Sequence, residues 1–88
     1  MRLLTTTRFE RDLKRANRRR KDLDKLWGVV RTLQSGEDLH VRYRPHRLSG
    51  QWSSFWECHI EPDWLLIWGY RDDALVLART GTHADLFG

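Results

Sequence analysis

The chain has 88 residues, of which 40% are apolar and 32% charged, with one cysteine, Cys58, and no apolar run near the ~18 residues of a membrane span. This size and composition predict one globular domain over residues 1–88, exclude a disulfide framework and a second, dinucleotide-binding domain, and favour a cytoplasmic protein with no membrane contact. Residues 1–50 carry 14 basic and 6 acidic side chains (+8), whereas residues 51–88 carry 2 basic and 6 acidic side chains (−4). The positive charge of the first half indicates a polyanionic partner such as nucleic acid. A solvated helical face would give the same charge and is the alternative.

The chain opens with a short strand candidate over residues 3–5, followed by a helix from Thr7. Thr7 and Glu10 have the S/T-x-x-E spacing of a capping box, in which each side chain satisfies a free backbone N–H. Phe9, Leu13 and Ala16 follow at i, i+4 and i+7. This spacing predicts one apolar stripe that faces the core.

The other faces of this helix and the residues after it are basic, and residues 17–21 are too polar to be buried. We interpret them as an exposed basic surface that docks on ribosomal RNA, with a merely solvated surface as the alternative. Its members are Arg11, Lys14, Arg15, Arg18, Arg19, Arg20 and Lys21.

A second helix is predicted to start near Asp22, and Gly36 suits the position just past its end. Its apolar residues keep helical spacing: Leu23, Leu26, Trp27, Val30 and Leu33. Only a few residues join the two helices, so we expect them to pack as an antiparallel hairpin.

Residues 37–50 lack periodicity and are predicted to form a loop. Strands are predicted over 56–60, 64–68 and 74–79, separated by turns that contain Pro62 and Asp72. Residues 64–68 are apolar on both faces, as expected of a central strand. The order is therefore β-α-α-β-β-β, an α+β fold in which a helical hairpin packs on a small, twisted, mostly antiparallel sheet.

Three histidines, one aspartate and one arginine fall where strands or loops meet turns: His46, His59, Asp63, Arg79 and His83. They allow a metal site, ordinary structural hydrogen bonds, or metal-free cleavage of RNA. Cleavage needs a base for the ribose 2′-OH, an acid for the leaving 5′ oxygen and a cation for the transition state, which imidazole and guanidinium supply. Trp64 and Phe87 lie next to these groups in sequence and are candidates to hold unstacked bases.

Three segments resemble the RelE/ParE superfamily of toxin–antitoxin toxins, specifically the YafQ-type mRNA interferases. They are His46-Arg47-Leu48-Ser49-Gly50-Gln51-Trp52, the run from Cys58 to Ile67 (CHIEPDWLLI), and the run from Arg79 to Phe87 (RTGTHADLF). The resemblance covers nearly the whole chain. Where the family usually has Arg before the Glu-Cys-His stretch, this chain has Trp56.

The resemblance implies an endoribonuclease that cuts mRNA in the ribosomal A site by 2′-OH attack, without metal or cofactor. It also implies a cognate antitoxin whose complex with the toxin binds operator DNA. The family's functional residues fall on His46, His59, Asp63, Trp64, Arg79, His83 and Phe87. His83 is the expected proton donor to the leaving group, His46 or His59 the base, Asp63 the orienting group and Arg79 the transition-state cation.

Two other functions remain open. A ParE-like toxin that targets DNA gyrase shares the fold but is not expected to keep the His/Asp/Arg set. A non-catalytic nucleic-acid-binding module would use only the basic first half, and it would show salt-sensitive binding without cleavage.

Overall fold

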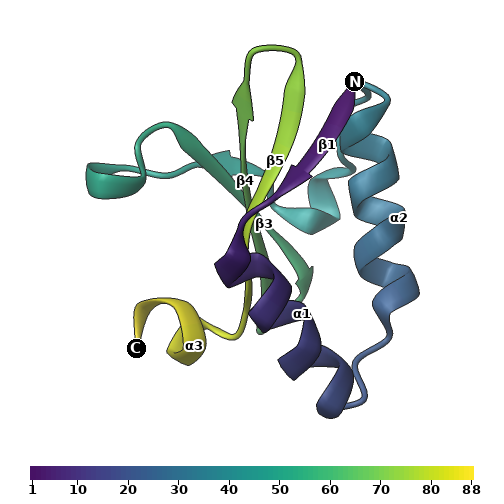
Figure 1. The fold of residues 1–88 in the computed structure, drawn as a ribbon, viewed down its shortest axis with the longest axis vertical. Helices are drawn as coiled ribbons and strands as arrows, with labels where there is room; N and C mark the ends of the chain where they lie inside the picture. The colour runs from purple at the N-terminus through teal and green to yellow at the C-terminus, as the bar shows by residue number, and fades with distance from the viewer.

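The sheet of the computed structural model has the strand order β1-β5-β4-β3-β2, and the structure describes all of residues 1–88. β1 (Arg2–Thr5) pairs in parallel with β5 (Ala74–Gly81), whereas β4 (Trp64–Arg71), β3 (Phe55–Glu61) and β2 (His46–Arg47) continue the sheet in antiparallel pairs. Figure 1 shows β4 in the middle of this sheet. The predicted α+β class and mostly antiparallel pairing are therefore confirmed.

Residues 64–69 of β4 are buried, and the strand lies between β3 and β5. Trp64, Leu66 and Trp68 belong to the core beneath the helices. Leu65 and Ile67 alternate with them and are also fully buried, on the opposite face. The apolar run was correctly predicted to be a central strand.

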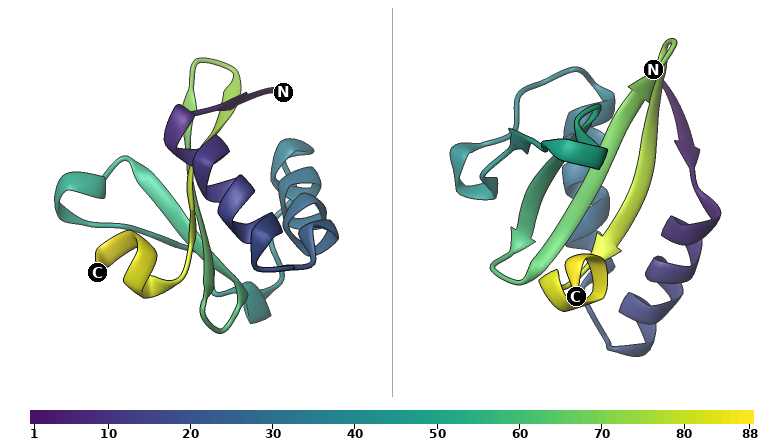
Figure 2. Two further views of the ribbon diagram at one scale, coloured as in Figure 1. Left: turned by 60° about the horizontal axis from the view of Figure 1, so that its bottom comes forward. Right: turned by 90° about the vertical axis from the view of Figure 1, so that its left-hand side faces the viewer.

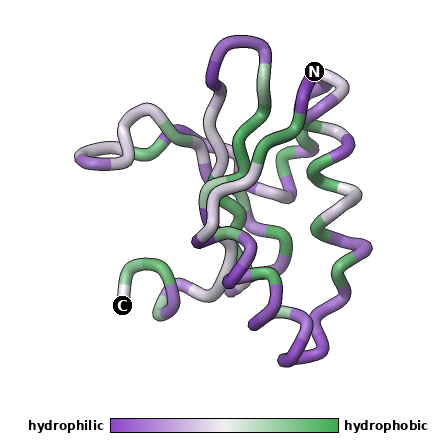
Figure 3. Tube along the Cα trace, in the orientation of Figure 1, coloured by the Kyte–Doolittle hydropathy of each residue, from purple (hydrophilic) through white to green (hydrophobic).

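Helices α1 (Thr7–Arg18) and α2 (Leu23–Gln34) form the expected hairpin on one side of the sheet. Phe9 and Leu26 are completely buried in the core that the two helices share with the sheet. Asp22 caps α2 as predicted, since its side chain accepts from the backbone N–H of Asp24. Figure 3 shows that the hydrophilic residues gather where α1 ends and the connection to α2 begins.

The cap of α1 differs from the prediction. Thr6, not Thr7, is the N-cap, and its hydroxyl accepts from the backbone N–H of Phe9 at 3.0 Å. The Thr6 hydroxyl also donates to the carbonyl of Ala78 on β5 at 2.7 Å, so the cap joins the helix to the sheet. This tertiary contact decides between two adjacent threonines, which local spacing does not distinguish.

Two parts of the chain are more ordered than predicted. The predicted loop contains the 3₁₀ turn η1 (Val41–Tyr43), the short strand β2 and the start of a second 3₁₀ turn, η2 (Gly50–Trp52). The C-terminus forms a short helix, α3 (His83–Phe87), on the face of the sheet opposite α1 and α2 (Figure 2). A capping box between Thr82 and Asp85 starts this helix.

Candidate active site

His83 and Asp63 form an ion pair at the start of α3. Asp63 lies in the turn between β3 and β4, and its Oδ1 is 2.7 Å from the ring Nδ1 of His83. The same oxygen accepts from the backbone N–H of His83 at 2.9 Å. These two hydrogen bonds, the backbone one first, lower the pKa of the Asp63 carboxyl. Both side chains are more than half exposed, so the Nε2 edge of His83 is open to a substrate.

His46 and Glu57 form a second imidazole–carboxylate pair across β2 and β3, where the two residues are register partners. His46 donates from Nδ1 to the carbonyl of Arg44 at 2.8 Å, and its Nε2 lies 3.3 Å from Oε1 of Glu57. Glu57 is only 5% exposed, and its Oε2 has no hydrogen-bond partner. Arg44 adopts a left-handed backbone (φ 50°) at the end of η1, and its carbonyl lies within hydrogen-bond distance of the His46 ring.

His59 lies between these two pairs. Its ring centroid is 6.5 Å from that of His46 and 5.6 Å from that of His83. His59 is the register partner of Leu65, and Glu57 is the register partner of Ile67. Side chains two residues apart on a strand point to the same side, so His59 and Glu57 share one face of the sheet. Neither nitrogen of His59 hydrogen-bonds to the protein, so either one is free to accept a proton. The structure therefore brings all three predicted histidines into one row.

Arg79 is held by a residue that the sequence did not single out, Asp12 of α1. Arg79 donates from Nε to Oδ2 of Asp12 at 2.6 Å and from Nη2 to Oδ1 at 3.1 Å. The backbone N–H of Thr80 also donates to Asp12 Oδ2, at 3.1 Å. Arg79 and Asp12 are both buried, and the hydrogen bond to Asp12 raises the pKa of the guanidinium. One planar edge of Arg79 is thus occupied, and only Nη1 has no partner in the protein.

Asp85 anchors α3 to α1 through the basic residues of α1. Arg19 donates from Nη1 to Oδ2 of Asp85 at 2.7 Å and from Nη2 to Oδ1 at 3.3 Å. Arg15 lies 3.6 Å from the same carboxylate and also donates to Asp12 at 2.9 Å. The hydrogen bond from Arg19 strongly lowers the pKa of Asp85. A chain of ion pairs therefore links the segment that carries His83 to the one that holds Arg79.

The basic surface predicted for RNA docking divides into two groups. Arg15, Arg19 and Lys21 make ion pairs inside the molecule, Lys21 with Glu61 at 3.1 Å. The remaining members have no ion-pair partner and are free to meet a polyanion: Arg11, Lys14, Arg18 and Arg20. Three of the seven residues therefore also stabilise the fold, and docking on RNA by the surface stays a prediction.

Trp64 is a core residue. It is 1% exposed, and its indole Nε1 donates to the hydroxyl of Thr80 at 3.0 Å. No ring face is available to a base, so the predicted base-holding role is corrected to packing. Phe87, in contrast, is 50% exposed on α3 and can meet a base. Alternation along β4 could have shown that Trp64 shares a face with Leu66 rather than with Leu65.

Trp56, which stands where the family usually has Arg, also belongs to the helix side of the sheet. It packs against the core, and the guanidinium of Arg47, its register partner, lies 5.8 Å from its ring centroid. Trp56 therefore lies on the opposite face of the sheet from the row of histidines. A basic side chain at position 56 would not face that row.

No three His, Cys, Asp or Glu side chains are arranged to hold a metal ion. Cys58 is completely buried, and burial raises the pKa of its thiol to about 12. It therefore supplies neither a thiolate ligand nor a nucleophile. No helix is long and apolar enough to span a membrane.

Comparison with known proteins gives the same family by sequence and by structure. The family model described as "Bacterial toxin of type II toxin-antitoxin system, YafQ" matches residues 1–88. The mRNA interferase toxin YafQ of Escherichia coli K12 is 41% identical over 81 residues, which cover 91% of this chain and 88% of that protein.

Two solved structures illustrate the likeness in fold. A copper-bound mutant toxin from Helicobacter pylori superposes with a TM-score of 0.95 at 36% identity, over 99% of both chains. The toxin in the E. coli DinJ-YafQ complex superposes with a TM-score of 0.91 at 38% identity, over 100% of both chains.

Proposed function

The chain belongs to the YafQ family of bacterial type II toxin–antitoxin toxins, and we propose that it cuts mRNA in the ribosomal A site by metal-free attack of a ribose 2′-OH. The two E. coli relatives that share 41% of its sequence are named mRNA interferases, which supports cleavage of RNA as the reaction class. The observation that carries the proposal is the pair of imidazoles His59 and His83. Their ring centroids are 5.6 Å apart, and only one of the two rings is bound to a carboxylate.

His59 is the base in this proposal. A base must offer a free ring nitrogen to the 2′-OH proton, and both nitrogens of His59 lack protein partners. His46 is less suited to this task because its two nitrogens already face the Arg44 carbonyl and the Glu57 carboxylate. Glu57 and the Arg44 carbonyl therefore hold the His46 ring in position beside the reacting phosphate.

His83 is the acid. Asp63 accepts from Nδ1 and stabilises the protonated ring, while Nε2 carries the proton to the open side. As the 2′ oxygen attacks phosphorus, the bond to the 5′ oxygen breaks and that oxygen takes the proton from His83. The products are a 2′,3′-cyclic phosphate and a 5′-hydroxyl end.

Arg79 stabilises the charge that builds up on the phosphate oxygens. It does so through Nη1, because Nε and Nη2 are bound to Asp12. The buried ion pair with Asp12 fixes the orientation of the guanidinium before the substrate binds, so the guanidinium does not have to reorient during the reaction. Phe87, exposed on the same short helix as His83, holds the base of a neighbouring nucleotide by stacking.

The free cations Arg11, Lys14, Arg18 and Arg20 dock the toxin on ribosomal RNA. The partners of this activity are the ribosome, its mRNA and a cognate antitoxin. The E. coli relative that forms a complex with DinJ supports an antitoxin for this chain as well. We further propose that the toxin–antitoxin complex binds operator DNA.

The test is to map the 5′ ends of cellular mRNA after brief induction of the toxin. In-frame cuts confined to translated messages are expected. The purified toxin is expected to cut a message on programmed ribosomes at a rate that does not depend on added transition metal, with Mg²⁺ held constant because the ribosome itself requires it. Arrest without new mRNA ends, accompanied by DNA damage, would identify a gyrase-targeting toxin instead. Salt-sensitive binding of RNA without any cuts would identify a binding module.

A further inference from the structure

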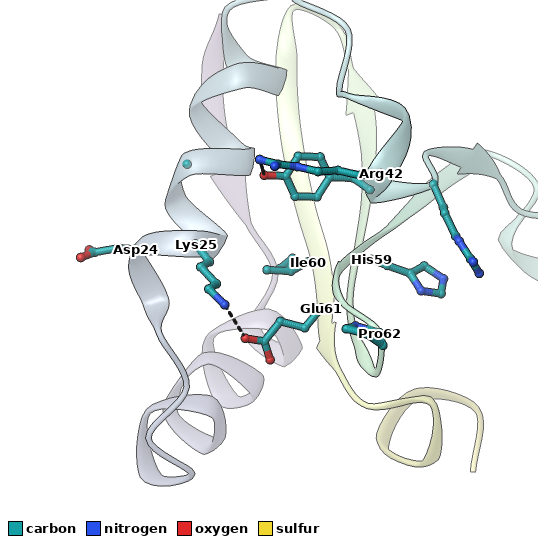
Figure 4. Close-up of a pocket in the computed structure, with 10 residues that line it drawn as sticks. Asp24, Lys25, Arg42, His59, Ile60, Glu61 and Pro62 are labelled. Atoms are coloured by element: carbon teal, nitrogen blue, oxygen red, sulfur yellow. Dashed lines mark hydrogen bonds and ion pairs between the residues drawn. The ribbon is translucent and has the colours of Figure 1, made fainter.

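A pocket of about 620 Å³ lies beside the row of histidines, between α2, η1 and the end of β3. Helix α2 contributes Asp24, Lys25 and Gly28, and the opposite wall consists of residues 42–44 and residues 59–62. Figure 4 shows Arg42 above the pocket, Glu61 and Pro62 below it, and His59 at its far side. Only two of the ten lining residues are hydrophobic, so the pocket suits a polar ligand.

The edge of the sheet is open at this pocket. β2 pairs only with Trp56 and Glu57 of β3, so the outer edge of β3 has no neighbouring strand from Cys58 to Glu61. Successive residues of a strand direct their backbone N–H and C=O groups alternately to the strands on either side. The backbone groups of Glu57 point toward β2, so those of His59, two residues later, point to the same outer edge. The pocket therefore offers backbone donors and acceptors as well as side chains.

The pocket also has positive charge that the protein itself does not neutralise. Glu61 is neutralised by Lys25 at 2.9 Å and Lys21 at 3.1 Å, and these hydrogen bonds, that of Lys25 first, lower its pKa. Arg42 lies over the Tyr43 ring at 4.8 Å and donates to its hydroxyl at 2.9 Å. Neither Arg42 nor Arg44 pairs with a carboxylate.

Two residues connect this pocket to the catalytic row. His59 lines the pocket and is also the middle imidazole of the row. Arg44 also lines the pocket, and its carbonyl accepts from His46. A chain that passes the histidines and continues over the edge of β3 therefore enters the pocket at once.

We propose that this pocket is a subsite for the RNA nucleotide next to the scissile phosphate, with Arg42 and Arg44 as its phosphate contacts. The inference rests on the proposed cleavage of RNA, because only a polyanionic chain cut at the histidines must extend into the adjacent pocket. Guanidinium groups bind phosphate through two N–H donors, and they also stack on bases. The subsite increases the binding of the message and leaves the chemical step at the histidines unchanged.

Two variants obstruct the subsite in different ways. Gly28→Leu narrows it from the α2 wall: a Cβ at Gly28 would meet only Arg31 Nη2, at 3.9 Å, and leucine is a better helix former than glycine. Arg42→Ala removes one phosphate contact. Arg31→Ala is the matched control, since Arg31 is an exposed cation on α2 that does not line the pocket.

The measurement is single-turnover cleavage of a message on programmed ribosomes across toxin concentrations, with thermal unfolding of each variant. We expect Gly28→Leu and Arg42→Ala each to raise the half-saturating toxin concentration about tenfold at an unchanged saturating rate. Arg31→Ala is expected to match the wild type. The double variant is expected to resemble Gly28→Leu alone, because an obstructed subsite has no phosphate left to lose.

Half-saturation equal to that of the wild type in both folded variants would overturn the subsite and leave the proposed cleavage standing. Absence of cleavage by the wild type would instead overturn both. If the variants lose affinity only for the antitoxin, the pocket is a protein-binding site and the RNA inference is wrong.

Discussion

The two imidazole–carboxylate pairs of this molecule are built from the same groups but sit in opposite surroundings. Asp63 lies in an exposed turn, and its Oδ1 accepts from both the ring and the backbone of His83. Glu57 is buried in the sheet, with one oxygen facing His46 at 3.3 Å and the other without a partner. An exposed carboxylate can orient a ring at little cost, whereas a buried carboxylate is costly to leave without a partner.

This difference assigns different tasks to the two histidines. His83 has one nitrogen bound and one open, which is what a proton donor needs. His46 has both nitrogens engaged, which suits a ring held in a fixed position. Variants of His83 and Asp63 are therefore expected to slow cleavage, whereas a variant of His46 is expected to lower stability.

His83→Ala is expected to reduce cleavage ~10²–10⁴-fold, the usual contribution of general acid–base catalysis. The ring is more than half exposed, so the thermal unfolding midpoint should stay close to that of the wild type. Single-turnover cleavage and a melting curve check both parts. A folded His83→Ala protein that cuts as fast as the wild type would contradict the assignment of the acid.

Asp63→Asn is expected to slow cleavage ~10–100-fold, because the amide no longer offers the His83 ring a charged hydrogen-bond acceptor. The pKa of Asp63 is lowered in the folded protein, so its charge adds stability above the ordinary pKa of 3.8. That stability is lost as the pH falls through the lower folded value. The difference in melting temperature between wild type and variant should therefore be present near pH 6 and vanish in acid. A difference that grows in acid would contradict this sign.

His46→Ala is expected to lower the free energy of unfolding by about 1–3 kcal/mol, because it leaves the Glu57 carboxylate buried without a partner. The double variant His46→Ala/Glu57→Leu removes that charge as well and should recover part of the loss. Chemical denaturation of the two proteins measures the effect. Equal stabilities of wild type and His46→Ala would show that Glu57 does not depend on His46.

Arg19→Gln should lower the saturating cleavage rate a few-fold, since Arg19 holds Asp85 and thereby the helix that carries His83. Arg18→Gln is the matched control from the same surface, where the side chain has no ion-pair partner. It should weaken ribosome binding and its salt dependence at an unchanged saturating rate. If the two variants behave alike, the Arg19–Asp85 pair has no positioning role.

The sequence predicted the order of the elements because hydrophobic spacing and turn residues act locally. Asp22 was correctly placed at the start of α2, and the doubly apolar β4 was correctly placed at the centre. Asp12, in contrast, lies 67 residues from Arg79, and no local pattern connects an acidic residue of a basic helix with a strand near the other end.

The site was predicted in its residues better than in their contacts. The three histidines and Asp63 converge because β2 pairs with β3 and the turn after β3, which carries Asp63, meets the start of α3. Trp64 follows Asp63 in the sequence, but the alternation along β4 directs its side chain into the core beneath the helices, away from the histidines. Thr82 and Asp85 have the spacing of a capping box, and this local signal indicates the start of α3.

The central claim is that two imidazoles move protons in a 2′-OH attack. The most direct test replaces the nucleotide at the mapped cut by its 2′-deoxy analogue in a message on programmed ribosomes. No cleavage is expected at that position, and a 2′,3′-cyclic phosphate is expected on the product of the unmodified message. Cleavage of the deoxy-substituted message at the same position and rate would contradict it, because the nucleophile would then not be the 2′-OH.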